Sequence, residues 1–501
     1  MSSPALASLA ALSPFIIAVG GVLSYFVAKA LPGKDLRWTG TFSAAWLGAI
    51  FILLLSAAAT ASFSGPGLTG PLLQPSALGI AFALLVTFLG GAAALASQGR
   101  LDPRGPLQLY YPLLLFALAG ASAAGFTRDL FTLFVAVELS AIPSYALVAY
   151  QRREEPRAVA AAVKYLLQGV TGTLTALLGI SLLYLAGHTL RITELPHALA
   201  SADPLLLAAA TVLVTVGYGV KLGVVPLHTW LPDAYSLAPA GVTAAMAGAT
   251  KAGSLLALVL SLAAIPAGGG AVPAGVLLLF LSVLTMTAGN LLALAQTDVR
   301  RLLAYSSIAQ MGYILLPFGI AITYGLATGI LAGLFYAIAY GLMKGGAFLS
   351  ADLLAGASGS PDIARMQGAG ARHPVTGIAF AIFILGLIGV PATAGFAGKA
   401  LIFFTGMSTL AWGGVILALV LAANSVLSLG YYVPLLSTLL FGGSGEAGHA
   451  GGESSPARRV PVSGAIAVAL LALVTVVLGF FPDAVTGLLA GAMAYFSWGV
   501  I

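Results

Sequence analysis

The sequence predicts an all-α polytopic membrane protein with about fourteen transmembrane helices. Hydrophobic residues make up 60% of the 501 residues and charged residues only 7%, which leaves too few polar side chains to cover a soluble domain of this size. Apolar stretches of at least ~18 residues, long enough to cross a bilayer, recur along the whole chain. They fall near 4–28, 40–62, 72–97, 107–126, 129–150, 158–186, 204–237, 238–262, 271–296, 302–322, 326–351, 374–411, 412–440 and 461–490.

Two of these stretches are too long for one straight crossing and contain proline. Pro226 and Pro232 interrupt 204–237, and Pro391 interrupts 374–411. Proline lacks the backbone donor that a helix interior needs, so each stretch predicts a discontinuous helix. Non-helical backbone at membrane depth is tolerated only where protein buries it or where it lines a wet cavity.

The apolar stretches group into four segments. An N-terminal three-helix segment spans 1–106, two five-helix segments span 107–262 and 271–440, and a C-terminal helix occupies 461–501. The discontinuous helix is the fourth in both five-helix segments. Because an odd number of crossings turns the second segment over, we predict two inverted five-helix repeats with an ion pathway near their broken helices.

The basic residues of the loops predict the orientation of the chain. Loops after odd-numbered stretches hold fourteen Lys and Arg residues, whereas loops after even-numbered stretches hold only Arg128 and Arg191. An excess of positive charge marks cytoplasmic loops, so we expect both termini on the outer side of a cytoplasmic (inner) cell membrane. The net charge of +6 then reflects orientation and does not indicate nucleic-acid binding. The fourteen residues are Lys29, Lys34, Arg37, Arg100, Arg104, Arg152, Arg153, Arg157, Arg300, Arg301, Arg365, Arg372, Arg458 and Arg459.

The remaining basic residues are lysines inside apolar stretches. Of the fifteen acidic residues, only Glu138 lies well inside such a stretch. A charge at bilayer depth costs ~2.5–3.5 kcal/mol on insertion scales, so several of them together indicate a function. The five lysines are Lys164, Lys221, Lys251, Lys344 and Lys399.

Two of the candidate residues have an alternative structural interpretation. Lys164 lies seven residues after Arg157 and could extend to the cytoplasmic surface. His228 follows the first helix break and could either form hydrogen bonds at a helix end or relay protons. The sequence leaves both alternatives open.

Proton transfer is the chemistry that these residue types permit. A lysine in a poorly solvated site loses its proton more readily, and a nearby carboxylate holds that proton in place. A unit charge at 4 Å is worth about 4 kcal/mol at an effective dielectric constant of 20, so opening one Glu–Lys pair could release a proton. Lysine does not bind Na⁺, and one acidic residue makes a poor cation site. Protons are therefore favoured over Na⁺ as the transported ion.

The chain offers little means of holding a cofactor. It contains no cysteine, which excludes disulfides, thiolate metal sites and Fe–S clusters ligated by this chain. Its histidines, His188, His197, His228, His373 and His449, lack the spacing of metal ligands. We therefore expect neither a metal nor another cofactor in this chain.

Six motifs resemble the antiporter-like membrane subunits of respiratory complex I, of the NADH–quinone oxidoreductase or F420H2 dehydrogenase type, which are related to Mrp antiporter subunits. The motifs are DLFTLFVAVELSAIPSYALVAY (129–150), AAVKYLLQG (161–169), VKLGVVPLHTWLPDAYSLAP (220–239), ATKAG (249–253), QTDVRRLLAYSSIAQMGY (296–313) and GVPATAGFAGKALIF (389–403). PDAYSLAP, TKAG, GFAGK, FYAIAYGLMKGGAF (335–348) and NSVLSLGYYVPLL (424–436) are most similar to the N-type subunit.

The resemblance implies a role for individual residues. Glu138 is similar to the family's glutamate that pairs with the lysine of the broken helix, here Lys221. Lys251 is similar to the central relay lysine, and Lys399 to the terminal lysine on the exit side. Lys164, Lys344 and His228 are further relay candidates.

The sequence departs from the N-type pattern at three positions. Lys344 stands where N-type chains are often uncharged, although L-type chains carry a lysine nearby. Tyr340 occupies the place of an L-type histidine, and Gln74 stands where relatives often carry an acid.

Together these features predict a proton-translocating subunit of a complex I-like redox-driven pump. The resemblance implies that Fe–S clusters, flavin and quinone are bound by partner subunits, which include other antiporter-like membrane subunits and hydrophilic redox subunits. One alternative is an Mrp-type Na⁺/H⁺ antiporter subunit without a redox partner, and another is a structural membrane subunit whose lysines carry no protons. The sequence leaves the electron donor and acceptor open.

Overall fold

The structure is a computed structural model that describes most of the chain. Within the described residues it is helical, with only three isolated β-bridges. Lys34, Arg104, Arg458 and His449 of the sequence analysis lie outside the described residues. The described residues are 3–30, 37–60, 73–101, 106–153, 155–265, 271–442, 459–491 and 496.

The helices follow the predicted segments. The first segment holds α1 (Ser3–Ala11), α2 (Ser13–Ala30), α3 (Arg37–Thr60) and α4 (Ala77–Ala96). The second holds α5 (Leu107–Ala123), the 3-10 turn η2 (Ala124–Phe126), α6 (Leu130–Val148), α7 (Arg157–Gly187), α8 (Leu195–Ala198), α9 (Pro204–Leu222), α10 (Leu231–Leu237), α11 (Ala240–Ala245), the π-helical turn η3 (Met246–Thr250) and α12 (Lys251–Ala263). The third holds α13 (Ala271–Leu294), α14 (Val299–Tyr324), α15 (Ala327–Ser358), the 3-10 turn η4 (Ile363–Met366), α16 (Ala369–Arg372), α17 (Pro374–Ile388), α18 (Ala394–Met407) and α19 (Trp412–Phe441). The last holds α20 (Val462–Phe480) and α21 (Asp483–Ala490).

The described part of the chain confirms the prediction of an all-α polytopic membrane protein. Thirteen of its helices are long and apolar enough to cross a membrane, or up to fourteen if α17 and the bent segment before it form one span. Several of the helices begin at a side chain that accepts a backbone N–H of the first turn, which satisfies one of the donors left free there. These residues are Ser76, Asp129, Asp203, Asp298 and Thr393.

The structure also confirms that two helices are discontinuous. The first is interrupted between α9 and α10, and the second between α17 and α18. The half-helices α9 and α17 end at Gly223 (φ 73°) and Gly389 (φ 97°), a left-handed conformation that favours glycine. In both, the N–H of the following residue, Val224 or Val390, donates to the carbonyl five residues earlier at 2.9 Å. The two breaks therefore begin with the same helix-ending motif.

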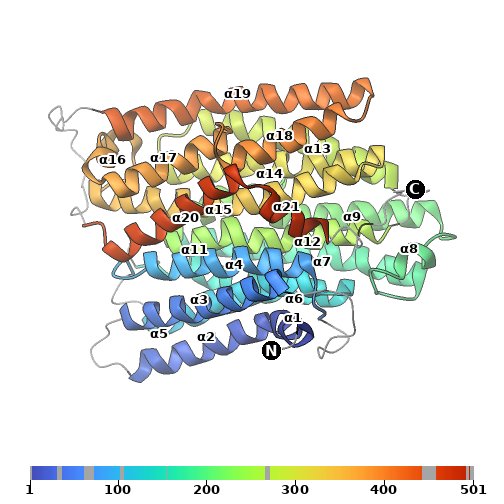
Figure 1. Cartoon of the computed structure of the whole chain (residues 1–501), viewed down its shortest axis with the longest axis horizontal. Helices are drawn as coiled ribbons and strands as arrows, with labels where there is room; N and C mark the ends of the chain where they lie inside the picture. The colour runs from blue at the N-terminus through green and yellow to red at the C-terminus, as the bar shows by residue number, and fades with distance from the viewer. Residues whose placement is uncertain are drawn as a thin grey trace.

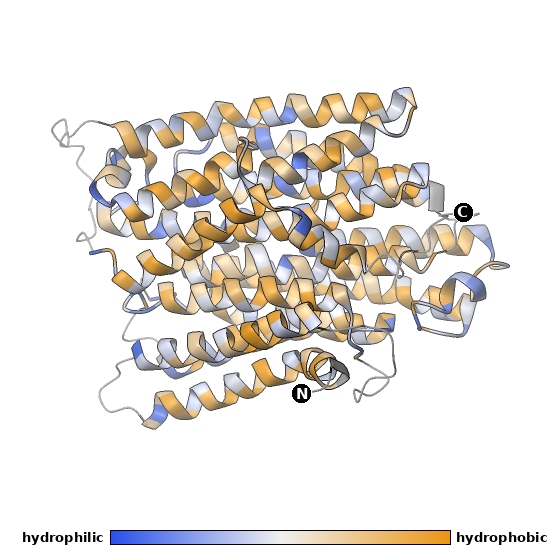
Figure 2. Ribbon diagram, in the orientation of Figure 1, coloured by the Kyte–Doolittle hydropathy of each residue, from blue (hydrophilic) through white to orange (hydrophobic). Residues whose placement is uncertain are grey.

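The long helices lie side by side, roughly along the horizontal axis of Figure 1. The short helices α8 and α16 lie at opposite ends of this bundle. Hydrophobic residues dominate the outer helices, whereas hydrophilic residues gather near the helix ends, as at α8 (Figure 2). This distribution is the one that a membrane-embedded bundle requires.

The centre of the bundle is formed by α14, α15 and the α11–α12 span. In each of these spans 94% of the most apolar window is buried, compared with 28% in α3 and in α19. The same helices join the two five-helix segments, since α10 packs on α14 and α11 packs on α15. Polar side chains on these helices are therefore screened from lipid by the chain itself.

Both five-helix segments contain the same neighbouring pairs. In the first, α5 packs on α6 and α7 on α9, and in the second, α13 packs on α14 and α15 on α17. This correspondence fits the predicted repeat. The inversion of one repeat relative to the other and the segment boundaries stay predictions.

Candidate proton-transfer site

Lys221 lies in the last turn of α9, directly before the helix break. Its side chain is 3% exposed, and its Nζ atom is 3.6 Å from Oε1 of Glu138 on α6. The same Nζ donates a 2.5 Å hydrogen bond to the hydroxyl of Tyr145. Glu138 and Tyr145 are seven residues apart, two turns along one face of α6. A single helix face therefore presents both a carboxylate and a hydroxyl to the lysine.

The break after Lys221 is fixed by a buried tryptophan. Trp230 donates from Nε1 to the carbonyl of Val220 at 2.8 Å, so it occupies an acceptor that the end of α9 leaves free. Its ring stacks on that of Tyr165 from α7, with 4.2 Å between the centroids. The loop that follows Lys221 is thus held against α7.

Lys251 begins α12, immediately after the π-helical turn η3. Single π-helical turns are rare and often occur at functional sites. The side chain is buried, and Nζ donates to Oγ of Ser307 on α14 at 3.0 Å. The Ser307 hydroxyl in turn forms a close hydrogen bond with the hydroxyl of Tyr340 on α15.

Lys344 lies in the middle of α15 and is fully buried. Its Nζ donates to Oγ of Ser306 at 2.6 Å and to the hydroxyl of Tyr432 on α19 at 3.4 Å. Ser306 and Ser307 are consecutive residues of α14. The two lysines therefore bind neighbouring hydroxyls from different sides of one helix.

Lys399 lies in α18, after the second helix break. Its Nζ donates to the carbonyls of Leu387 and Ile388, each at 2.9 Å. Both carbonyls belong to the last turn of α17, which carries partial negative charge because its acceptors lack helical partners. The carbonyl of Leu387 also accepts a 3.3 Å hydrogen bond from the side-chain amide of Gln310 on α14.

Each of the four buried lysines lies near the face of a tyrosine ring. An ammonium group within about 6 Å of a ring centroid is attracted by the ring electrons. Among the described residues, only Lys221 of these four also forms an ion pair with a carboxylate. The pairs are Lys221–Tyr145 (4.9 Å), Lys251–Tyr235 (5.3 Å), Lys344–Tyr432 (5.9 Å) and Lys399–Tyr313 (4.6 Å).

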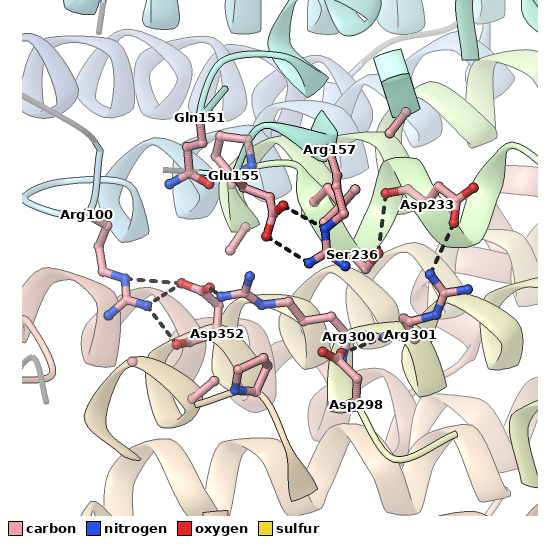
Figure 3. A pocket seen from close by; sticks show the side chains of 18 of the residues that line it. Arg100, Gln151, Glu155, Arg157, Asp233, Ser236, Asp298, Arg300, Arg301 and Asp352 are labelled. Carbon is pink, nitrogen blue, oxygen red and sulfur yellow. Dashed lines mark hydrogen bonds and ion pairs between the residues drawn. The ribbon is translucent and has the colours of Figure 1, made fainter. Parts of the chain in front are cut away.

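Lys164 lies apart from this row, on the wall of a cavity of about 680 Å³ (Figure 3). Its side chain is 39% exposed, and its Nζ forms a 2.8 Å ion pair with Asp233 of α10. Asp233 also binds Arg301, at 3.1 Å. The structure therefore places Lys164 in a charged cavity rather than among the buried lysines.

The cavity contains a second carboxylate that the sequence analysis missed. Asp352 binds Arg100 and Arg300, with 2.5 Å to each guanidinium, and the contact with Arg100 can be followed in Figure 3. The predicted stretch stops at 351, whereas α15 continues to Ser358. The eight-residue spacing between Lys344 and Asp352, which keeps both on similar faces of a helix, was the available signal.

His228 lies half-buried in the connection between α9 and α10, where its carbonyl accepts the N–H of Leu231 at 3.0 Å. No hydrogen bond among the described residues joins its ring to a lysine. Gln74 lies outside the site, before α4, where its N–H donates to the carbonyl of Phe126 at 2.9 Å. Within the described ranges, no group of three or more His, Asp or Glu residues is placed to hold a metal ion.

The family described as NADH:quinone oxidoreductase/Mrp antiporter, transmembrane, matches residues 127–427, which include the helices of all four buried lysines. The chain belongs to this family. A relative from Sorangium cellulosum, named NADH-quinone oxidoreductase subunit N 1, is 36% identical over 96% of this chain and 98% of its own. A second relative, NADH-quinone oxidoreductase subunit N from Desulfitobacterium hafniense, is 35% identical over 74% of this chain and 75% of its own.

Two solved structures share the fold along nearly the whole chain. A chain of respiratory complex I from Thermus thermophilus is 30% identical with a TM-score of 0.74, covering 97% of this chain and all of the other. A chain of the Mrp complex from Dietzia is 21% identical with a TM-score of 0.81, covering 98% of both chains. At that identity, the second likeness shows the fold alone.

Proposed function

We propose that this chain is a proton-translocating membrane subunit of a complex I-like pump, driven by electron transfer in partner subunits. The observation that carries the proposal is the row of buried lysines, which begins at the Glu138–Lys221 pair and ends at Lys399. Burying charges in a membrane protein is costly, so such groups mark ion and proton pathways. The curated relatives named NADH-quinone oxidoreductase subunit N support the same conclusion.

The proposed cycle begins with separation of Glu138 from Lys221. Without its carboxylate partner, the buried Lys221 ammonium loses stabilisation and releases its proton. The proton passes by water to Lys251 and then to Lys399, which releases it outward. Lys344 is a further relay candidate because it binds the hydroxyl next to that bound by Lys251.

Protons would enter this row from the charged cavity. Its walls include Arg100, Arg157 and Arg300, which belong to loops that the charge asymmetry places in the cytoplasm. Asp233 lines the cavity, and Tyr235, two residues later on α10, faces Lys251 with its ring. The short helix α10 thus separates the cavity from the buried row. Lys164 and His228 would act on this entry side.

The chain would have no redox site of its own. Fe–S clusters, flavin and quinone would belong to partner subunits, and the donor would be NADH or F420H2. This assignment makes the chain a non-redox part of a translocating oxidoreductase in a cytoplasmic cell membrane, with both termini outside. Its neighbours would be other antiporter-like membrane subunits and hydrophilic redox subunits.

The likeness to the Mrp complex favours one second candidate, a Na⁺/H⁺ antiporter subunit without a redox partner. The two functions differ in what the chain assembles with. The deciding experiment is to tag this chain in its host, extract it in mild detergent, and analyse the purified complex by mass spectrometry and low-temperature EPR. Stoichiometric Fe–S signals and hydrophilic redox subunits are expected. A complex of membrane subunits alone, with transport that depends on Na⁺, would instead establish the antiporter.

A further inference from the structure

Two buried lysines from different five-helix segments meet at adjacent serines. Lys251 of the first segment donates to Ser307 at 3.0 Å, and Lys344 of the second donates to Ser306 at 2.6 Å. Both serines are fully buried. Among the described residues neither lysine forms an ion pair with a carboxylate, so hydroxyl oxygens and tyrosine rings stabilise their charges.

A tyrosine extends this contact toward the second lysine. The hydroxyl of Tyr340 forms a close hydrogen bond with Ser307, and its side chain is 2% exposed. Tyr340 and Lys344 are four residues apart on α15, so they are neighbours on one helix face. Lys251, Ser307 and Tyr340 form a hydrogen-bonded chain that leads from α12 across α14 to the turn of α15 before Lys344.

The hydroxyl group suits proton transfer because it both donates and accepts hydrogen bonds. A hydroxyl that takes a proton on its oxygen can give up the proton that it already holds, and it remains neutral. A methyl or phenyl group at the same place would keep the packing but could do neither. The two hydroxyls are therefore the groups whose removal separates relay from packing.

We propose that Ser307 and Tyr340 relay the proton from Lys251 to Lys344, and so carry it from the first five-helix segment to the second. The proposal rests on the proposed proton-translocating function. The Lys251 ammonium gives a proton to Oγ of Ser307, the original Ser307 proton moves to the Tyr340 oxygen, and the Tyr340 proton moves to the neutral amine of Lys344. At the end of the step both hydroxyls are unchanged, and one positive charge has moved from Lys251 to Lys344.

The test uses the intact complex in sealed membrane vesicles and compares protons moved per electron with the rate of electron transfer. Ser307→Ala and Tyr340→Phe remove one hydroxyl each. Their controls are Ser350→Ala and Tyr111→Phe, which remove buried hydroxyls without a hydrogen-bond partner among the described residues. We expect Ser307→Ala and Tyr340→Phe to lower the proton yield about tenfold or more, the lower range for loss of a proton-transfer group. Ser307→Thr, which keeps the hydroxyl, should restore pumping.

Normal proton yield in an assembled Ser307→Ala or Tyr340→Phe complex would overturn the relay. If Ser307→Ala does not assemble, Tyr340→Phe decides, because phenylalanine keeps the ring and its packing. Lys399→Ala is measured in parallel. Loss of pumping in Lys399→Ala alone would leave the proposed function in place and remove only the relay, whereas normal pumping in all three variants would remove both.

Discussion

Glu138 and Lys221 form an ion pair that is not a hydrogen bond, because 3.6 Å separates Oε1 from Nζ. The lysine donates to Tyr145 instead, at 2.5 Å. The carboxylate therefore stabilises the ammonium mainly through its charge, and a small movement of α6 or α9 would weaken this attraction without breaking a hydrogen bond between the two. The pair has the geometry of a contact that opens easily.

Replacing Glu138 with glutamine tests the charge of this pair. The amide has nearly the same shape but lacks the charge, which at about 4 Å is worth about 4 kcal/mol at an effective dielectric constant of 20. We expect Glu138→Gln to assemble normally and to lose most of its proton pumping per electron, measured in vesicles. Glu155→Gln is the control, since its partner Arg157 is 79% exposed and exposed pairs contribute only about 0–1 kcal/mol. Equal pumping by both variants would refute a role for the Glu138 charge.

Lys344→Met separates function from stability. A buried ammonium costs free energy, and replacing buried charged groups with apolar residues of similar volume is often neutral or stabilising by about 1–4 kcal/mol. We therefore expect this variant to resist thermal aggregation in detergent at least as well as the unchanged complex while pumping fewer protons per electron. A less stable complex with full pumping would assign Lys344 a structural role.

Asp352 is expected to stabilise the bundle rather than to carry protons. Its carboxylate lies between Arg100 and Arg300, and it is 14% exposed. Removing one partner of a buried pair costs about 3–5 kcal/mol because the other charge stays behind. Asp352→Asn should therefore lower the temperature of aggregation of the solubilised complex, by much more than Glu155→Gln. An unchanged aggregation temperature would contradict this account of the cavity.

Gly389→Ala tests the second helix break. Gly389 has φ 97°, and an added Cβ atom would lie 3.0 Å from Cδ of Lys399. A left-handed conformation costs a non-glycine residue about 1–2 kcal/mol, and the new methyl group would push the lysine from its carbonyl partners. We expect reduced pumping with modest loss of stability, whereas Gly48→Ala, whose added Cβ meets nothing within 4 Å, should change neither. Full pumping by Gly389→Ala would show that the position of Lys399 is not critical.

The sequence could predict the helices and the charged residues because both depend on local composition. Apolar length identifies a span, and Pro226 and Pro391 identify the breaks without any tertiary contact. Lysines at bilayer depth are conspicuous in the same way. The Glu138–Lys221 pairing came from the family resemblance, and the structure brings the two residues into contact.

The partners of the other lysines could not be predicted from the sequence. Ser306, Ser307 and Tyr340 are ordinary residues of apolar helices until α12, α14 and α15 pack together. The π-helical turn before Lys251 has no sequence signal that distinguishes it from α-helix. The position of Lys164 depended on Asp233 and Arg301, which are separated from it by more than sixty residues.

The most direct test of the account is the number of protons translocated per electron by a Lys221→Ala complex in sealed vesicles. Lys221 is the only one of the four buried lysines with a carboxylate partner among the described residues, and the proposed cycle begins there. The account predicts an assembled complex with normal Fe–S content whose proton yield is lost or greatly reduced. An undiminished proton yield per electron in that complex would contradict the claim that protons pass through this row of lysines.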